Sequence, residues 1–588
     1  MNKKKCNIVF LLFVFLTNLA LGKEQTIVEN KMSRSSFSEI AQQYEASLFE
    51  YSPELGLFWG KTDVALDRFT DWSVQGYKDW HRQEDAFLFA LRELDEATLR
   101  GSAEYTTYLL LKATLEAKQA SRICREELWD VNPARGWHNK LAIVAEKQPV
   151  GTPEYRAQAM RRWQSFPKVV DIQINNLKLG IQRGYTAPKP AVKRVLTQIH
   201  LMLNNPIEQS PYFDFARRDG DPTFKANVAD LIKTKINPAL KIYSDYLEKE
   251  YMAFARAEIG VSALPAGQAC YQAKINEETT LSISPEEIHA LGLATIEKIS
   301  WEVADIGLKR YETNNMAMVF QRAEEESVGD FSTEKDIIDY NLQSLDKVMK
   351  KLPNYFDMMP KADGILKPYP QHRAITGASG EYHPPNDTGT EPGIFYINTY
   401  EPQKKSRIDQ EATLFHELIP GHHFQIALAY ENTELPTVNR YLFNAGFGEG
   451  WALYVERLAD EMGLYQDEIS RLGMLSNEAL RAARLVVDTG IHAFHWNREQ
   501  AIDYLKQHTA LADAIIEGEV DRYIMMPGQA TAYTLGKNEI EHLRQEAQKR
   551  LGPRFDIRLF HHQVLKHGMV SLPILRMEIK KWIASYDL

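Results

Sequence analysis

Apolar positions recur at three- and four-residue spacing along most of the first 250 residues. The pattern runs through residues 36–251 and is clearest in residues 105–123 and 190–203. Such spacing places apolar side chains on one face of a helix. The sequence therefore predicts a series of amphipathic helices in this part of the chain, in which strand signals are scarce.

A further helix is predicted to begin at residue 285. Ser284 can cap it, Pro285 suits its first turn, and Glu287 completes a capping box. Helical periodicity returns after residue 406 and continues almost to the end of the chain. We find no internal repeat.

Residues 358–402 break this helical pattern. They are rich in proline and glycine, and the β-branched and aromatic residues 394–398 form the best strand candidate. We therefore predict a mainly α fold, a large helical two-lobed body with a small β-sheet just upstream of residue 411. A boundary within residues 259–272 would divide an N-terminal helical lobe, residues 23–270, from a catalytic lobe, residues 271–588.

The composition is that of an ordinary folded protein. The chain has 588 residues, of which 44% are hydrophobic and 25% are charged. It carries 69 basic and 79 acidic residues, a net charge of −10, and no basic run beyond the first five residues. Because the electrostatic footprint of a nucleic-acid-binding protein is missing, we expect no nucleic-acid partner.

Residues 1–22 have the pattern of a signal peptide. Lysines at positions 3 to 5 precede the apolar run 6–20, and the small residues Ala20 and Gly22 mark a cleavage site. The alternative is an uncleaved membrane anchor, but this run is shorter than the roughly 20 residues that a spanning helix needs. We expect cleavage before Lys23, a periplasmic or secreted protein, and no stable membrane insertion afterwards.

Two cysteines remain after the signal segment, Cys124 and Cys270. Exported proteins form disulfides readily, but two thiols in so long a chain are not a disulfide framework. The sequence leaves open whether the two are bridged.

The segment with the clearest chemistry is rich in histidine. Residues 415–425 read Phe-His-Glu-Leu-Ile-Pro-Gly-His-His-Phe-Gln, and residues 449–454 read Glu-Gly-Trp-Ala-Leu-Tyr. Imidazole nitrogens and carboxylates suit Zn²⁺, and a glutamate beside the first histidine can serve as general base toward a metal-bound water. The segment is thus similar to an HExxH site, with His416 as a ligand and Glu417 as the base.

The second histidine departs from the HExxH pattern. In that motif the two histidines are four residues apart and face one ion, but here the fourth residue after His416 is Pro420. Proline cannot donate the helical hydrogen bond, so we expect a break or bulge at this point. Looping out two residues would bring His422 to the ligand position, which favours it over His423. A buried histidine pair beside a helix break is the structural alternative.

Several segments together resemble a known bacterial family. They are HExxPGHH, EGWALY, Asp488-Thr-Gly-Ile-His492, Arg522-Tyr523 with residues 527–536, and Phe560-His561 with Val564-Leu565. With them the chain resembles the bacterial domain of unknown function 885 family over nearly its whole mature length. That family is distantly similar to glutamate-liganded zinc peptidases such as carboxypeptidase Taq, thimet oligopeptidase and angiotensin-converting enzyme. The resemblance implies one Zn²⁺ per chain, with His416, His422 and Glu449 as ligands and Glu417 as the base.

Other residues of these motifs are candidates that also have structural alternatives. Tyr533 can donate its hydroxyl to the oxyanion or pack in the core. Asp488 can orient a ligand histidine or pair with His492, which we keep as a catalytic candidate. His561 is another candidate for the oxyanion. Arg522 can hold a substrate carboxylate or pair with an acid.

These residues predict an exported zinc metallopeptidase that hydrolyses short peptides in a deep cleft. By analogy with other zinc peptidases, residues 394–398 would lie along the cleft edge and pair with the peptide substrate. One alternative is a zinc amidase acting on cell-wall peptides or acylated amino acids. Another is a non-catalytic periplasmic binding protein with a vestigial metal site. A degenerate site would lose its base first, so the presence of Glu417 favours catalysis.

Overall fold

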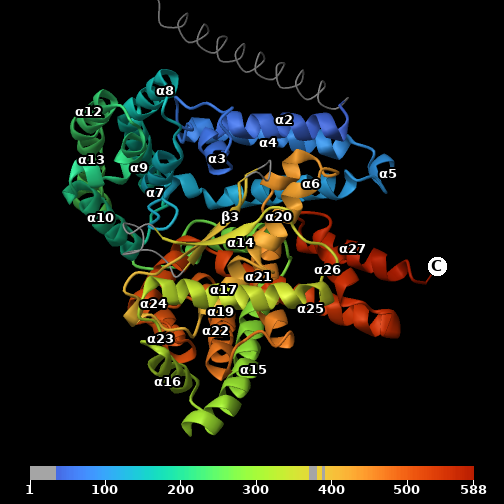
Figure 1. Cartoon of the computed structure of the whole chain (residues 1–588). Helices are drawn as coiled ribbons and strands as arrows, with labels where there is room; N and C mark the ends of the chain where they lie inside the picture. Colours follow the sequence, from blue (N-terminus) through green and yellow to red (C-terminus); the bar gives the residue numbers. More distant parts are fainter. Residues whose placement is uncertain (1–34, 370–379, 387–390, 588) are drawn as a thin grey trace, which may run out of the picture.

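The fold is mainly α, as predicted, with one small β-sheet (Figure 1). The computed structural model describes residues 35–369, 380–386 and 391–587. The predicted signal peptide, residues 1–22, lies outside the described residues. Among the described helices, none combines the length and apolar character required to cross a bilayer.

In the described part of the chain before residue 260, helices joined by loops are the regular elements, and there is no strand. The predicted helices at 105–123 and 190–203 are confirmed as α6 and α10. Figure 1 shows α2 and α4 side by side at the top of the view and the group from α7 to α13 beside them. The α-helices are α2 (Phe37–Tyr51), α3 (Pro53–Phe58), α4 (Val74–Glu93), α5 (Glu96–Leu99), α6 (Tyr105–Ser121), α7 (Trp137–Lys147), α8 (Pro153–Gln164), α9 (Phe166–Arg183), α10 (Lys189–Asn204), α11 (Asp214–Arg218), α12 (Pro222–Leu231) and α13 (Asn237–Lys249).

Helices also dominate the rest of the chain. The predicted start at residue 285 is confirmed, since Ser284 and Glu287 form a capping box at α15. The helices are α14 (Gly267–Thr279), α15 (Pro285–Tyr311), α16 (Met316–Ser327), α17 (Glu334–Lys351), α19 (Gln410–Glu417), α20 (His422–Glu431), α21 (Ala445–Glu461), α22 (Glu468–His492), α23 (Arg498–His508), α24 (Asp513–Met525), α25 (Ala532–Leu551), α26 (Ile557–Leu565) and α27 (Leu572–Ala584).

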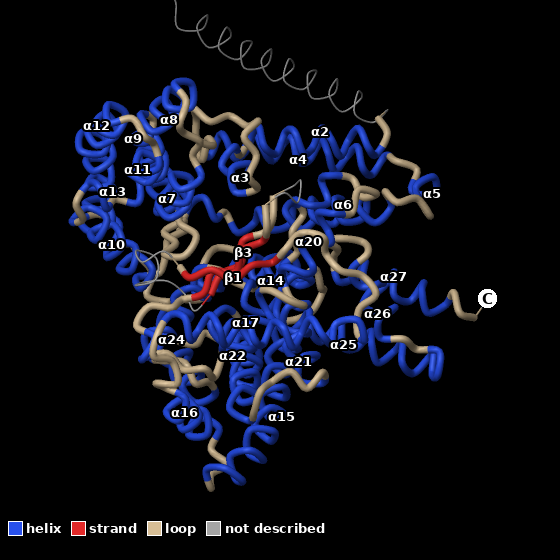
Figure 2. Tube along the Cα trace, viewed as in Figure 1, coloured by secondary structure: helices blue, strands red, loops and turns tan. Residues whose placement is uncertain are grey.

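The sheet has three short strands in the order β1-β3-β2 and lies near the centre of the molecule (Figure 2). The predicted strand at 394–398 is confirmed as β3 (Gly393–Ile397), which pairs in parallel with β1 (Gly364–Pro368) and antiparallel with β2 (Gly380–His383). Its expected pairing with a substrate is wrong, because both edges of the central strand are already hydrogen-bonded. Strand β2 lies at one edge of the sheet.

Three hydrophobic clusters form the core. One lies mainly among the N-terminal helices α7 to α13, with Leu57, Leu66 and Phe69 packed into it. Another joins α2, α4 and α6 to α17, α21 and α25, so apolar packing continues across residue 270. The division into two lobes at that residue stays a prediction. The pairing of Cys124 and Cys270, which the sequence left open, is a disulfide that joins the segment after α6 to α14.

Candidate metal centre

The helix break predicted at Pro420 separates the two histidines of the motif. Helix α19 ends at Glu417 and α20 begins at His422. The connection is tight: a Cβ atom on Gly421 would lie 1.8 Å from the carbonyl oxygen of His416, so only glycine fits there. Trp451 of α21 donates a hydrogen bond from Nε1 to the Pro420 carbonyl at 2.9 Å. Helix α21 therefore fixes the position of the break.

The break brings His416 and His422 together with Glu449 of α21. Their potential ligand atoms all lie within 4.8 Å of one another. Glu449 Oε2 is 3.7 Å from His416 Nε2 and 3.4 Å from His422 Nε2. Two ligands bound tetrahedrally to zinc at about 2.1 Å would be about 3.4 Å apart. The two distances to Glu449 are close to this spacing, so the three residues are suited to hold a single zinc ion.

A second carboxylate orients His416 from the opposite side of the ring. Glu456 Oε1 lies 2.7 Å from His416 Nδ1, and the Glu456 side chain is buried. Burial alone would lower the pKa of His416, but its contacts with Glu449 and Glu456 outweigh burial and raise it to about 9. When Nδ1 donates to Glu456, Nε2 is left to bind a metal. The sequence analysis missed Glu456, although its spacing of seven from Glu449 places both on one helix face.

A hollow of about 440 Å³, here called the metal cavity, lies beside the three residues and is also lined by Glu417 and Tyr533. Close packing of α21 against α25 brings Tyr533 there. A Cβ atom on Gly450 would lie 2.5 Å from the backbone of Gly536, so glycine permits this approach. Burial, followed by the charge of Glu449, raises the pKa of Tyr533, which keeps its hydroxyl protonated.

His423 points away from the metal cluster. Its Nε2 donates to the Ala362 carbonyl at 3.0 Å, and its Nδ1 accepts from the Tyr382 hydroxyl at 3.0 Å. Both ring nitrogens therefore hold the sheet against α20. The geometry favours His422 over His423 as the ligand, in the direction that the sequence indicated.

Three arginines and a tyrosine of the metal cavity were not identified from the sequence. Arg440, Arg481 and Arg484 line it, and the Arg484 guanidinium lies 4.6 Å from the centre of the Tyr533 ring. Tyr382 of β2 lines it too, and burial, followed by the charge of Glu417, raises the pKa of this tyrosine. These residues lie outside the histidine motif, and only the tertiary fold brings them to it.

The structure does not bring His492 to the metal cavity, which corrects the expectation of a catalytic role. The Val261 amide donates to its Nδ1 and its Nε2 donates to the Tyr523 carbonyl, both at 3.0 Å. Burial lowers the pKa of His492 to about 3, so the ring is neutral. Asp488 neither orients a cluster histidine nor pairs with His492, because it accepts from the Tyr271 hydroxyl and the Gly528 amide.

His561 and Arg522 also lie outside the lining of the metal cavity. His561 is buried, with its ring nitrogens within 2.8 Å of the Tyr454 hydroxyl and the Tyr355 carbonyl. Arg522 pairs with Glu519 at 3.0 Å and donates to Gln529. Both have the structural role that the sequence analysis offered as the alternative.

The fold and the cluster define a mainly α protein with a candidate metal centre of two histidines and one glutamate. The chain belongs to the DUF885 family, described as a bacterial protein of unknown function, whose model matches residues 53–579. This confirms the family that the motifs indicated.

Two solved structures have a similar fold. A "putative lipoprotein" from Colwellia psychrerythraea is 24% identical, with a TM-score of 0.85 over 95% of this chain and 99% of that chain. A "putative lipoprotein of unknown function" from Shewanella oneidensis is 17% identical, with a TM-score of 0.73 over 92% of this chain and 99% of that one. At these identities the similarity concerns the fold alone. No curated protein matches the sequence significantly.

Proposed function

We propose that this chain is an exported zinc metallopeptidase that hydrolyses short peptides. The observation that carries the proposal is the convergence of His416, His422 and Glu449 beside Glu417 at the wall of one cavity. Two histidines and a carboxylate, with a fourth position left open, are a ligand set of catalytic zinc sites. One zinc ion bound there would act as a Lewis acid toward water and the scissile carbonyl.

The remaining chemistry belongs to side chains of the metal cavity. Glu417 is the general base: its carboxylate accepts the proton of the attacking water and returns it to the leaving amine. No hydrogen bond or ion pair to another described residue engages this carboxylate. The hydroxyl of Tyr533 is the donor to the oxyanion that develops on the carbonyl. A tyrosine can act in this way because its raised pKa keeps the proton in place.

The lining of the metal cavity favours peptides with a free carboxylate. Arg484 is only 6% exposed; its Nη2 pairs with Glu519 and its Nε donates to the Tyr523 hydroxyl, but its Nη1 has no hydrogen-bond partner among the described residues. Nη1 can therefore donate to a carboxylate, and Arg440 and Arg481 add positive charge to the lining. Strand β2 forms another part of the wall, where an extended peptide can add as a further strand.

Export is supported by three observations. The N-terminal segment has the pattern of a cleaved signal peptide. The Cys124–Cys270 disulfide suits an oxidising compartment. The similar chains from Colwellia and Shewanella are described as putative lipoproteins. We propose cleavage before Lys23 and not lipid attachment, because Cys6 lies inside the apolar run.

The Glu417→Gln variant tests the proposal. Elemental analysis should find about one zinc per chain in both wild type and variant, because the ligands are unchanged. Hydrolysis of a library of short peptides should fall by about 10²–10⁴-fold in the variant, since glutamine cannot accept the proton. Glu434→Gln, at an exposed position outside the metal cavity, is the matched control.

Two results would contradict this function. One is a wild-type protein that takes up no stoichiometric zinc. The other is a Glu417→Gln variant that retains full turnover. Amidated and free peptides compared side by side would show whether the arginines recognise a terminal carboxylate.

A further inference from the structure

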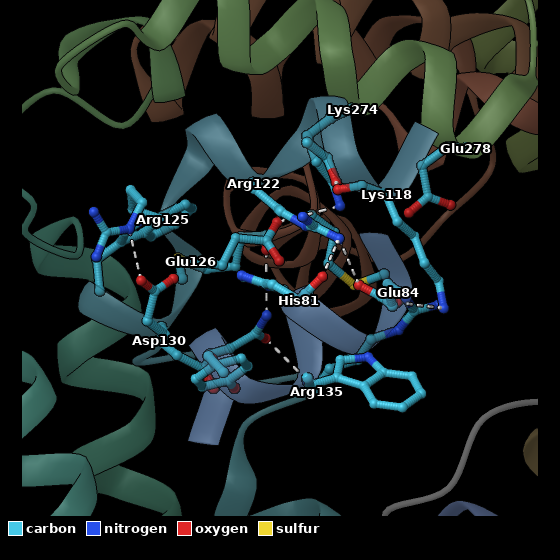
Figure 3. Close-up of a pocket in the computed structure, with 18 of the residues that line it drawn as sticks. His81, Glu84, Lys118, Arg122, Arg125, Glu126, Asp130, Arg135, Lys274 and Glu278 are labelled. Carbon is cyan, nitrogen blue, oxygen red and sulfur yellow. Dashed lines mark hydrogen bonds and ion pairs between the residues drawn. The ribbon is translucent and has the colours of Figure 1, made fainter. Parts of the chain in front are cut away.

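A second cavity, of about 430 Å³, lies between the first helices of the chain and α14 and α24 (Figure 3). We call it the charged cavity. Its lining shares no residue with that of the metal cavity. Ionisable side chains of both signs line it: the cations Lys118, Arg122, Arg125, Arg135, Lys140 and Lys274, and the carboxylates Glu84, Glu126, Glu127, Asp130 and Glu278.

Part of this lining is neutralised internally. Glu84, whose side chain is 4% exposed, lies 3.1 Å from Arg122 and 3.6 Å from Lys118. Lys274 lies 3.2 Å from Glu126 on the other side. These pairs hold one another in place and leave little charge for a ligand.

Four other lining residues are not paired in this way. Asp130, Arg135, Lys140 and Glu278 make no ion pair and no side-chain hydrogen bond with any residue that the structure describes. Asp130 lies within electrostatic range of Lys140, and Glu278 within that of Lys274 and Arg135. Burial raises the pKa of Asp130 to about 6, and the charge of Lys140 opposes that rise. Burial likewise raises the pKa of Glu278, against the charges of Lys274 and Arg135.

The walls of the charged cavity are fixed in position by distant parts of the chain. The disulfide joins Cys124, which follows Arg122, to Cys270 on α14, one turn before Lys274. The Asn132 side chain donates to the Met525 carbonyl of α24 at 3.2 Å. A site whose walls are held before binding loses less entropy when a ligand enters.

An aromatic surface lies beside the charges. The rings of Tyr51 and Trp80 stack at 4.6 Å with an angle of 6° between their planes. Both residues line the charged cavity. They offer an apolar contact to a side chain of a small ligand.

We propose that the charged cavity binds a small zwitterion, a free amino acid or a dipeptide. Arg135 and Lys140 would hold its carboxylate, and Asp130 and Glu278 would hold its ammonium group. A ligand with only a negative charge would face the two unpaired acids, and one with only a positive charge would face the two unpaired cations. The volume lies within the range of small-molecule sites. This inference does not depend on peptidase activity.

Titration calorimetry with glycyl-tyrosine tests the proposal. All measurements use the full chain carrying Glu417→Gln, so that the probe is not hydrolysed. Adding Asp130→Asn and Arg135→Gln should weaken binding by about tenfold or more, since each removes a charge-assisted hydrogen bond. The matched control is Glu297→Gln with Lys298→Gln, two exposed residues on α15 with the same change in charge. Acetylating or amidating the dipeptide should weaken binding similarly.

The alternatives give different results. If the dipeptide does not bind, or binds the Asp130/Arg135 variant as well as the control, the proposal is wrong. Sensitivity to only one blocked terminus would identify a ligand of a single charge and would also overturn it. Binding lost with Arg484→Gln and not with Asp130→Asn/Arg135→Gln would place the dipeptide in the metal cavity. If the dipeptide binds as expected but the wild-type chain hydrolyses no peptide, only the proposed peptidase function is contradicted.

Discussion

Two of the groups of histidines and carboxylates in the described C-terminal part of the chain make an instructive pair, because only one of the two has a geometry suited to a metal. His416 and His422 direct Nε2 atoms toward Glu449 at the wall of a cavity. His492 lies one turn after Asp488 on α22, but both of its ring nitrogens bond backbone groups. The residue types are alike, and the difference lies in the partners of the ring nitrogens.

The two groups differ in which ring nitrogens are left available. Glu456 holds Nδ1 of His416 by a hydrogen bond that fixes the ring, whereas the buried Nδ1 of His422 has no hydrogen-bond partner among the described residues. In both residues Nε2 remains available beside Glu449 at the wall of a cavity. A histidine whose two ring nitrogens both form hydrogen bonds within the protein has a structural role.

The largest expected effect is on zinc affinity, which should depend far more on His422 than on His423. Zinc binding of about 10–16 kcal/mol by four ligands corresponds to about a 10²- to 10³-fold change in affinity for each ligand. His422→Ala should lower zinc affinity by about that factor, and His423→Ala by less than about tenfold, in a competition assay with a chromogenic chelator. The opposite ranking would mean that the break at Pro420 presents the other histidine.

Asp488, in the second group, should make the free energy of unfolding depend on pH. Burial raises its pKa to about 7, although the Tyr271 hydroxyl and the Gly528 amide act in the other direction. In the unfolded chain an aspartate ionises near pH 3.9, so the neutral form favours folding below that value and this contribution is lost as the pH rises to about 7. Relative to wild type, Asp488→Asn should therefore gain unfolding free energy, up to about 4 kcal/mol, between pH 4 and 7.

Urea unfolding of both proteins at several pH values measures this difference. Asp503→Asn, at an exposed position, should show no such trend. A constant difference between Asp488→Asn and wild type would mean that the carboxyl is ionised in the fold throughout this range.

Glu456 sharpens the comparison, because His416 has this carboxylate as a partner at one ring nitrogen, whereas both nitrogens of His492 bond backbone groups. Glu456→Gln should lower zinc affinity by about 10–100-fold, the usual effect of removing a partner of a ligand histidine. Zinc affinity measured by chelator competition checks this, with Glu461→Gln on the same helix as the control. Equal affinities in the two variants would show that His416 needs no orienting carboxylate.

The smallest effect is expected from His492→Phe. The variant loses two hydrogen bonds to the backbone and should unfold about 2 kcal/mol more easily. Zinc content and turnover per folded molecule should stay at wild-type values. A loss of turnover at unchanged stability would mean that His492 takes part in catalysis.

The metal cluster was more predictable from the sequence than the rest of its cavity. His416, Glu417 and His422 belong to one short motif, and proline chemistry predicts the break between them. The family resemblance added Glu449. The partners of His492 could not be foreseen, because Val261 is 231 residues away in the sequence. For the same reason the arginines of the metal cavity and the edge position of β2 required the structure.

The Cys124–Cys270 disulfide ties the helices before Cys124 to α14. It keeps two Cα atoms 4.8 Å apart while 146 residues of sequence separate them. The helices before Cys124 therefore cannot move away from α14 by translation. A displacement that carried all the helices before Cys124 away from α14 as one body would have to turn about this covalent link.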